Sequence, residues 1–259
     1  DRMPTGATVN RDTGVRGILT AEQRWRMSES WTLLAEGSYI SDESFVPAYF
    51  ESLGKNRREF TNRLLAQRTG ENTVFTAQAK GSLNDFVANE YLLQSQGYSV
   101  AKLPEVAYVR LADDVLYESF PGSLTYFSEY RAGRLELQFD ENTAASRGMN
   151  SLARAQRAFG ITPTQSPGDA LRAAGLTEDA VHRLDTRHEL AAKIPWGPAI
   201  VTPFVVGRVT AYDDDFSSYN AGRGDDIRLW SAAGVRVSTT VSRVYEDVES
   251  RVLDLHRLR

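Results

Sequence analysis

Residues 183–212, RLDTRHELAAKIPWGPAIVTPFVVGRVTAY, decide the fold class of this chain. Charged and apolar side chains alternate with a period of two through the first half, which is typical of a β-strand with two different environments. Pro195-Trp196-Gly197-Pro198 interrupts the alternation, because proline cannot donate to a sheet and glycine permits a reversal. A second alternating run follows the break. The stretch therefore predicts a long antiparallel hairpin.

The two faces of this hairpin differ in chemistry. The charged face is expected to carry Arg183, Asp185, Arg187, Glu189, Ala191 and Lys193 from the first strand, and Thr202, Phe204, Val206, Arg208, Thr210 and Tyr212 from the second. The other face is apolar, with small residues such as Val201, Val205 and Val209 in the second strand. The fold class then depends on whether this apolar face meets a protein core or lipid.

Composition sets broad limits on the protein. The chain has 259 residues, of which 41% are hydrophobic and 25% charged, with a net charge of −4, which excludes disorder. No apolar run is long enough for a transmembrane helix, but strands of a membrane barrel hide their hydrophobicity in alternation. Cysteine is absent, which excludes disulfides and thiolate metal sites, and the mild acidity gives no reason to expect nucleic acid. The start at Asp1 resembles the middle of a longer protein.

The same alternation recurs along most of the chain. It predicts strands over residues 15–26, 31–39, 59–69, 73–82, 103–111, 123–139, 183–194, 199–212, 227–244 and 250–259. The faces of 103–111 cannot be assigned from the pattern. A change of phase near Gly133 predicts a β-bulge in the strand over 123–139.

Short and long connections alternate between these strands. Short breaks fall near Met27, Gly70, Pro121, Trp196 and Asp247, whereas long ones fall near Phe45, Gln94, Ala155 and Phe216. Bacterial outer-membrane barrels are built with short turns at one end and long loops at the other.

The longest connection, residues 140–182, is expected to contain short helices. The segment 151–159 has a helical pattern, and Ser166-Pro167 is a helix start with an N-cap and a proline in the first turn. A further helical turn is predicted over 177–181. This loop could plug a barrel, contact a partner or simply cap the barrel.

A soluble β-sandwich or lipocalin-like barrel would show the same alternation. Three features favour a membrane barrel instead: strands of about ten residues or more, apolar faces with aromatic residues toward their ends, and charges of both signs on the other face. An arginine on a lipid face would cost about 2–4 kcal/mol, and the pattern places Arg187, Lys193, Arg208 and Arg236 on the opposite face. We predict an all-β fold, an antiparallel up-and-down membrane β-barrel segment of about ten strands that forms one domain over 1–259 and part of a larger barrel.

Two sets of residues are candidates for function on this prediction. Lumen-facing candidates for substrate contact are Arg16, Glu22, Glu36, Arg63, Lys80, Arg131, Arg187, Glu189, Arg208, Tyr212 and Arg236. These charges could guide an anionic amphiphile or form a mutually neutralising wall that keeps the lumen wet, and the sequence favours neither. The expected lipid-interface anchors are Trp25, Trp31, Tyr39 and Trp196.

The sequence gives little support for catalysis or metal binding. Its histidines are His182, His188 and His256. His188 falls on the apolar face and is expected at the membrane interface, whereas His182 with Asp185 could serve an outer-membrane protease, although neither spacing nor a nucleophile supports that reading. The acidic residues at 213–215 and 225–226 could bind Ca²⁺, but a solvated loop is favoured. We predict no enzyme activity, cofactor or metal.

Four short motifs resemble those of one family. They are Ser41-Asp42 followed by Phe45, Tyr49 and Phe50; Leu103-Pro104-Glu105; Pro203 with Val205-Val206, Gly207-Arg208 and Tyr212; and Leu258-Arg259. In these motifs the chain resembles the barrel domain of the outer-membrane lipopolysaccharide-assembly protein (LptD, or organic solvent tolerance protein) family.

The resemblance implies a large barrel in the bacterial outer membrane, whose lumen and lateral seam pass lipopolysaccharide to the outer leaflet. It also implies a plug lipoprotein, periplasmic bridge proteins and membrane lipids as partners. The sequence departs from the family in lacking its periplasmic jelly-roll domain, further strands and the cysteines of some members. A general porin-like barrel, an outer-membrane enzyme and a soluble all-β binding module remain the alternatives.

Overall fold

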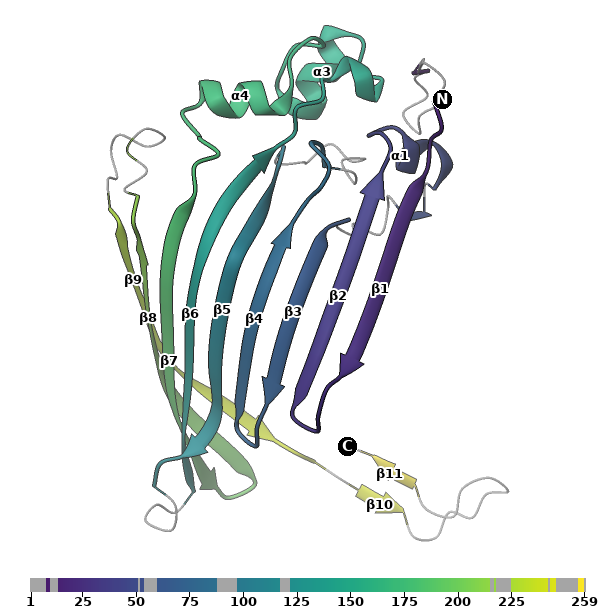
Figure 1. Ribbon diagram of the computed structural model, residues 1–259. Helices are drawn as coiled ribbons and strands as arrows, with labels where there is room; N and C mark the ends of the chain where they lie inside the picture. The colour runs from purple at the N-terminus through teal and green to yellow at the C-terminus, as the bar shows by residue number, and fades with distance from the viewer. Residues whose placement is uncertain are drawn as a thin grey trace. The chain divides into compact units, whose positions relative to one another are not determined.

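The computed structural model describes residues 8–9, 14–50, 52–53, 60–87, 97–116, 122–214, 217, 225–241, 243–245 and 256–258. Within these residues, nine strands form one antiparallel up-and-down sheet in chain order (Figure 1). The strands are β1 (Ile18–Arg26), β2 (Trp31–Ile40), β3 (Asn62–Thr69), β4 (Thr73–Gly81), β5 (Tyr98–Asp114), β6 (Ser123–Phe139), β7 (Val181–Trp196), β8 (Ala199–Tyr212) and β9 (Ile227–Thr239). The predicted all-β, up-and-down architecture is confirmed. Among the described residues β1 and β9 do not pair, so the sheet is not closed there.

The contacts within the chain divide it into two compact units. Unit 1 comprises Asp1–Tyr108, Tyr130–Asp185 and Thr210–Arg228, and unit 2 comprises Val109–Glu129, Thr186–Val209 and Leu229–Arg259. Unit 1 therefore contains β1 to β4, one end of the longer strands and the helices. Unit 2 contains the other end of the strands β5 to β9.

The predicted alternation of connections is confirmed from β1 to β9. Residues 27–30, 70–72, 115–122 and 197–198 link the pairs β1–β2, β3–β4, β5–β6 and β7–β8, whereas 41–61, 82–97, 140–180 and 213–226 form the other links. Because consecutive strands are antiparallel, every second connection lies at the same end of the sheet. We call these ends the turn end and the loop end.

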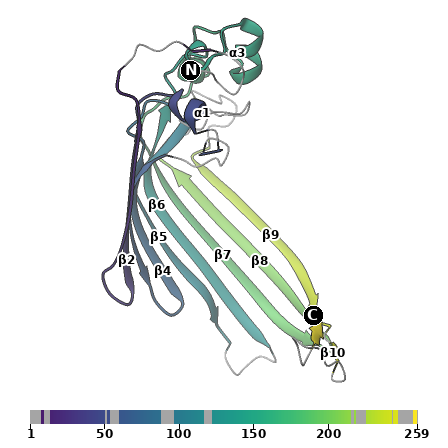
Figure 2. The same cartoon turned by 90° about the vertical axis from the view of Figure 1, so that its right-hand side faces the viewer.

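The strand register in unit 1 separates two kinds of side chain across β1 to β4, which lie side by side in Figure 1, as β5 to β9 do in Figure 2. One row pairs Trp25 with Leu33, Leu33 with Ala66, and Ala66 with Ala77. Another row, three residues away along each strand, pairs Glu22 with Glu36, Glu36 with Arg63, and Arg63 with Lys80. Since side chains alternate between the faces of a strand, the first row belongs to an apolar face and the second to a polar face.

The apolar face carries large exposed side chains. On it Leu19 and Leu64 are 72% and 51% exposed in unit 1, and Val235 is 62% exposed in unit 2. Ser38 and Leu65, in contrast, are buried on the polar face. A one-sided sheet in a soluble protein buries its apolar face and exposes its polar face, so the burial here is reversed.

A small apolar core lies at the loop end of unit 1. Ile40 at the end of β2 packs with Val46, Phe60 and Phe86, and Val46 comes from helix α1 (Phe45–Tyr49). Phe60 falls within the strand predicted over 59–69, but it precedes β3 and is buried in this core.

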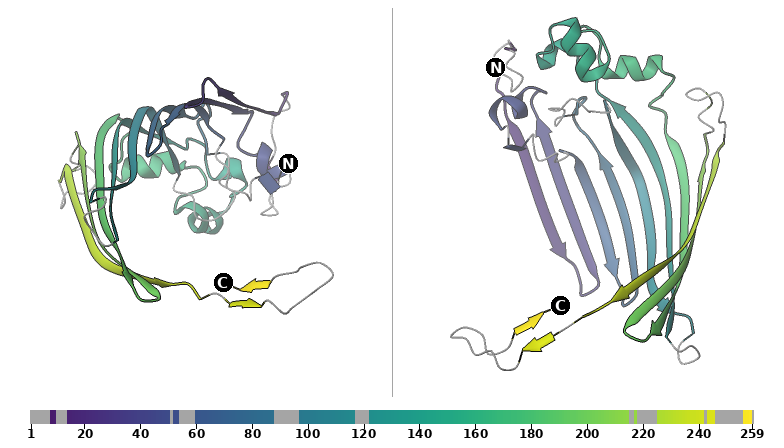
Figure 3. Two further views of the ribbon diagram at one scale, coloured as in Figure 1. Left: turned by 90° about the horizontal axis from the view of Figure 1, so that it is seen from below. Right: turned by 180° about the vertical axis from the view of Figure 1, so that it is seen from behind.

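The connection between β6 and β7 folds into a compact helical loop. It contains η1 (Ala145–Arg147), α3 (Leu152–Phe159) and α4 (Pro167–Ala173), and Ala144, Ala155 and Ile161 form its core. The view from below shows α3 and α4 to one side of the strands of unit 1 (Figure 3).

The predicted helix starts in this loop are confirmed. The Ser151 side chain accepts a hydrogen bond from the Arg154 amide, and Ser166 forms a capping box with Asp169. The helical turn predicted over 177–181 is wrong: the segment carries no helix, and β7 begins at Val181.

The last predicted strands differ from the structure. The strand expected over 227–244 ends at Thr239, and a separate two-stranded sheet pairs β10 (Arg243–Tyr245) with β11 (His256–Leu258). The described part of the tenth strand predicted over 250–259 therefore pairs with β10, outside the large sheet. Residues 250–255 and 259 lie outside the described residues. No described helix is long and apolar enough to cross a membrane.

Candidate functional site on the polar face

A continuous polar belt crosses the strands of unit 1. Its first part is the row of Glu22, Glu36, Arg63 and Lys80 from β1 to β4. The belt continues because Arg63 Nε donates to Gln78 Oε1 at 3.1 Å, and Gln78 Nε2 donates to Glu105 Oε1 at 2.6 Å. Four of the predicted lumen-facing residues thus lie on one face. Glu22, Glu36 and Arg63 also line a hollow of about 310 Å³.

Glu105 on β5 is the centre of the belt and is only 5% exposed. Besides Gln78, it accepts hydrogen bonds from Lys102 Nζ and Arg131 Nη1, each at 3.1 Å. A carboxylate this buried is stable only with such charged and polar donors around it. The predicted residue Arg131 therefore neutralises a buried charge.

Gly133 on β6 permits the close approach of β5 at this point. A Cβ atom at Gly133 would lie 3.1 Å from Glu105 Cβ and 3.2 Å from Glu105 Cα, closer than ordinary van der Waals contact. Arg131 and Gly133, two residues apart on β6, both contact Glu105. In a regular strand residues two apart lie on the same face, so the strand alternates without interruption here. These contacts give no support for the β-bulge predicted here. The Leu103–Pro104 peptide bond just before Glu105 is cis.

A second buried carboxylate lies near the loop end of β7 in unit 1. Asp185 is 5% exposed and accepts hydrogen bonds from Thr210 Oγ1 at 2.5 Å and Arg183 Nη2 at 2.9 Å. Arg183 and Arg228 lie over the ring of Tyr212 at 5.8 and 5.3 Å from its centroid. Tyr212, a predicted lumen-facing residue, thus contacts two arginines.

Unit 2 carries a different arrangement, which we call the arginine–phenylalanine cluster: Phe127, Arg187, Glu189, Phe204 and Arg236. Glu189 accepts from Arg187 Nη2 at 2.5 Å through one carboxylate oxygen and from Arg236 Nη2 at 3.1 Å through the other. The Arg187 guanidinium lies 4.9 Å from the Phe127 ring centroid, and that of Arg236 lies 4.0 Å from the Phe204 ring centroid. The three charged members were predicted from alternation.

The two phenylalanines were not selected from the sequence. Phe204 had been placed on the charged face, and that phase was the signal that could have identified it. Gly234 on β9 makes room for its ring, because a Cβ atom there would lie 2.9 Å from Phe204 Cζ. Arg208 lies on the same face of β8 as Thr210, and Lys193 lies on the same face of β7 as Glu189, because side chains alternate between the two faces of a strand.

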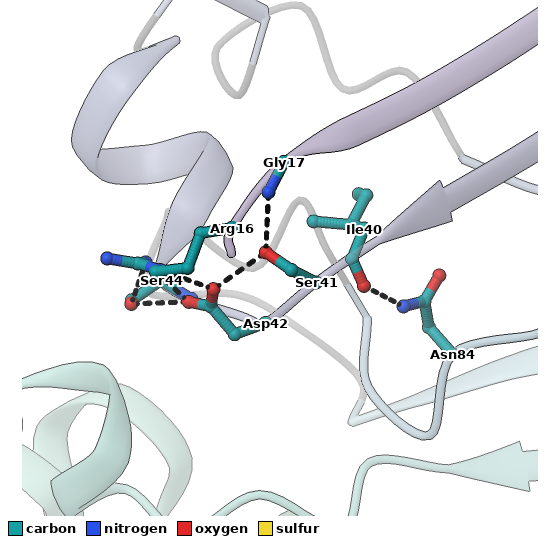
Figure 4. A network of polar contacts seen from close by, with 7 residues as sticks. All are labelled: Arg16, Gly17, Ile40, Ser41, Asp42, Ser44 and Asn84. Atoms are coloured by element: carbon teal, nitrogen blue, oxygen red, sulfur yellow. Dashed lines mark hydrogen bonds and ion pairs between the residues drawn. The ribbon is translucent and has the colours of Figure 1, made fainter. Parts of the chain in front are cut away.

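A polar network ties β1 to the first loop-end connection in unit 1 (Figure 4). Arg16 precedes β1, so it is outside the strand in which it was predicted, and its guanidinium bonds both carboxylate oxygens of Asp42 at 2.7 Å. Ser41 and Ser44 hydroxyls donate to the same carboxylate at 2.9 and 2.7 Å. Burial acts to raise the pKa of Asp42, but the bonds from Arg16, Ser44 and Ser41 outweigh it and lower the pKa to about 2.

The helical loop has its own ion pairs. Arg147 pairs with Asp140, both buried, and burial raises the pKa of Asp140 despite the arginine. Arg172 bonds Glu141 and Glu178, which raises the pKa of the Arg172 guanidinium. Glu178 also accepts from the Phe139 amide at 2.9 Å, which ties the loop to the end of β6.

His182 and Asp185, the pair considered for a protease, bond different partners in the structure. His182 bonds Asp213 through Nδ1 at 2.6 Å, whereas Asp185 bonds Thr210 and Arg183, so the pair imagined for a protease does not meet. The bond from His182 lowers the pKa of Asp213.

His188 lies on the apolar phase of β7 in unit 2. Its Nδ1 is 2.6 Å from the Tyr126 hydroxyl, and its Nε2 is 2.7 Å from Thr186 Oγ1. Within the described residues, no group of three or more acids and histidines could hold a metal ion. Asp215 and the side chain of His256 lie outside the described part of the chain.

The predicted interface anchors lie on strands at or near their ends. Trp25, Tyr39 and Trp196 are exposed, and Trp31 packs edge-on against Phe75 at 6.4 Å between ring centroids. Trp25 and Trp31 adjoin the turn end of unit 1, and Tyr39 its loop end. Trp196 adjoins the turn between β7 and β8.

Neither a family model nor a curated protein sequence matches this chain.

Proposed function

We propose that this chain is a segment of an outer-membrane β-barrel that passes lipopolysaccharide to the outer leaflet and carries out no catalysis. The observation that carries the proposal is the reversed burial of the sheet. Large apolar side chains such as Leu64, Val205 and Val235 are exposed on one face, and several polar and charged side chains, among them Ser38, Glu105 and Asp185, are buried on the other.

Lipid is the solvent that suits the apolar face. Contiguous exposed apolar surface is rare in soluble proteins, whereas a membrane strand presents such a face to the acyl chains. The rows through Trp25, Leu33, Ala66 and Ala77 would then contact lipid. The alternation of turns and loops agrees with this orientation, since short turns are periplasmic and long loops extracellular in such barrels.

The choice of lipopolysaccharide rests on the resemblance, and two of its motifs have central positions. Asp42 of the Ser41-Asp42 motif is bonded by Arg16, and Glu105 of the Leu103-Pro104-Glu105 motif lies at the centre of the polar belt. The plug lipoprotein and periplasmic bridge proteins are proposed as partners on the same basis.

A general porin-like barrel is the second candidate. The polar belt favours it, because Glu105 is neutralised by Lys102 and Arg131, as in a wall that keeps a lumen wet. The two candidates differ in whether the polar face contacts lipopolysaccharide in cells.

Photo-crosslinking in a Gram-negative host separates these functions. A crosslinker that replaces Arg208 is expected to capture lipopolysaccharide, whereas a crosslinker at Val205 on the apolar face captures bulk lipid. Capture at Val205 alone would favour the porin-like barrel. Recovery of the protein in the soluble fraction would contradict both membrane functions.

A further inference from the structure

We infer that Arg187 and Arg236 form a binding site for a phosphate group of an anionic amphiphile, and that Glu189 occupies this site when the ligand is absent. The identification of the ligand as an amphiphile rests on the proposed function. The phosphate site itself rests on the geometry of the arginine–phenylalanine cluster in unit 2.

Glu189 already binds the two arginines as a phosphate would. Its carboxylate is only 15% exposed and spans both guanidiniums, with one oxygen on each. Phosphate and carboxylate match the same planar donor groups of arginine. An oxygen-rich dianion placed between Arg187 and Arg236 would keep both bonds that Glu189 makes and add charge.

Both guanidiniums retain donors for such a ligand. Within the described residues, each makes one side-chain hydrogen bond and one aromatic contact. An arginine has five N–H donors, so most of them stay available. The side chain of Arg236 is 58% exposed, which leaves it accessible from the polar face.

The aromatic rings hold the arginines in place without using these donors. Arg187 and Arg236 lie over the rings of Phe127 and Phe204, and a cation–π contact takes up no hydrogen-bond acceptor. Gly234 lets the Phe204 ring lie against β9. The site is therefore preorganised, which lowers the entropic cost of binding.

Exposure distinguishes this cluster from the polar belt. Each carboxylate serves two cations, but Lys102 and Arg131 around Glu105 are 28% and 33% exposed, and Gln78 also donates to that carboxylate. Arg236 in the cluster is 58% exposed and Glu189 15%, so a ligand can reach the guanidinium from the polar face. Lys193 lies on the same face of β7 as Glu189, four residues further along the strand. It is exposed and has no ion-pair partner among the described residues.

Binding of lipid A with and without its phosphates tests the inference on the full chain in detergent. The parent protein is expected to bind diphosphorylated lipid A more tightly than dephosphorylated lipid A. Replacing one charged donor removes a charge-assisted bond, so Arg236→Gln should weaken binding of the diphosphorylated form by about tenfold or more. Arg110→Gln, at another cation of unit 2 that is paired with Asp113, serves as the control and should leave affinity unchanged.

Glu189→Gln gives a second test that does not depend on loss of function. Removing the resident anion is expected to raise affinity for diphosphorylated lipid A, while the dephosphorylated form gains nothing. Equal binding by Arg236→Gln and the parent, or weaker binding by Glu189→Gln, would overturn the phosphate site.

Inorganic pyrophosphate separates this inference from the proposed function. If the parent binds pyrophosphate through Arg187 and Arg236 but not lipid A, the phosphate site stands and the lipopolysaccharide function fails. If crosslinking in cells captures lipopolysaccharide while Arg236→Gln changes no affinity, the function stands and the phosphate site fails.

Discussion

Val235→Arg on β9 distinguishes lipid from water at the apolar face. Val235 is 62% exposed and lies well inside Ile227–Thr239. In water, a substitution at so exposed a position changes stability by about 0.5 kcal/mol or less. In a bilayer, arginine on the lipid face costs about 2–4 kcal/mol near the midplane. That cost corresponds to a shift of roughly 30- to 1,000-fold in the folding equilibrium.

The assay is reversible folding of the purified protein into lipid vesicles, followed by tryptophan fluorescence across a urea gradient. Ser238→Arg is the matched control, because Ser238 is exposed on the same strand in phase with Arg236. We expect Val235→Arg to lower the free energy of unfolding by at least 2 kcal/mol more than the control. Equal effects of the two substitutions would refute the assignment of the apolar face to lipid.

Three further predictions concern the contacts that hold unit 1 together. Asp42→Asn should lower the free energy of unfolding by about 1–2 kcal/mol at neutral pH. Folding lowers the pKa of Asp42 from 3.8 to about 2, so this stabilisation is present above pH 3.8 and is lost as the pH falls toward 2. The acid-unfolding curves of parent and variant should therefore converge at low pH. Gly133→Ala brings a Cβ atom against the β5 backbone and should lower the free energy of unfolding in urea by about 1–2 kcal/mol. Gly207→Ala is the control and should be neutral, because no atom lies within 4 Å of the Cβ position at Gly207. Equal effects of the two substitutions would contradict the close approach of β5 to β6. Asp140→Asn leaves Arg147 without its buried counter-charge and should destabilise the helical loop by about 3 kcal/mol, seen as faster proteolysis within 140–180, while the exposed control Asp179→Asn leaves the rate unchanged.

The sheet was predictable because alternation is a local property of the chain. The hairpin over 183–212 matches β7 and β8 closely, and the charged phase of β7 brings Arg187 and Glu189 together. The helices at Leu152 and Pro167 were predictable for the same reason, since their caps lie within a few residues. The helical turn predicted over 177–181 does not form, because Glu178 bonds Phe139 and Arg172, and such contacts between distant residues are not part of local helix propensity.

The partners of the buried carboxylates could not be predicted. Glu105 depends on Gln78 and Arg131, which come from other strands, and the faces of its own strand were not readable from the pattern. The alternation predicted that Arg16 faces the lumen from a strand, but its bonds to Asp42 hold it just before β1. Alternation therefore predicts which face a residue occupies, whereas pairing across strands decides whether its charge is free or neutralised.

The most direct test of the central claim is solvent accessibility along β8 in a bilayer. The chain contains no cysteine, so single cysteines at successive positions from 200 to 210 can carry a spin label without background. We predict a period of two: labels at Val201, Val205 and Val209 are relaxed by oxygen dissolved in lipid, and labels at Thr202, Phe204 and Arg208 by a water-soluble nickel complex. Labels on both faces reached equally by the nickel complex would contradict a membrane-spanning sheet.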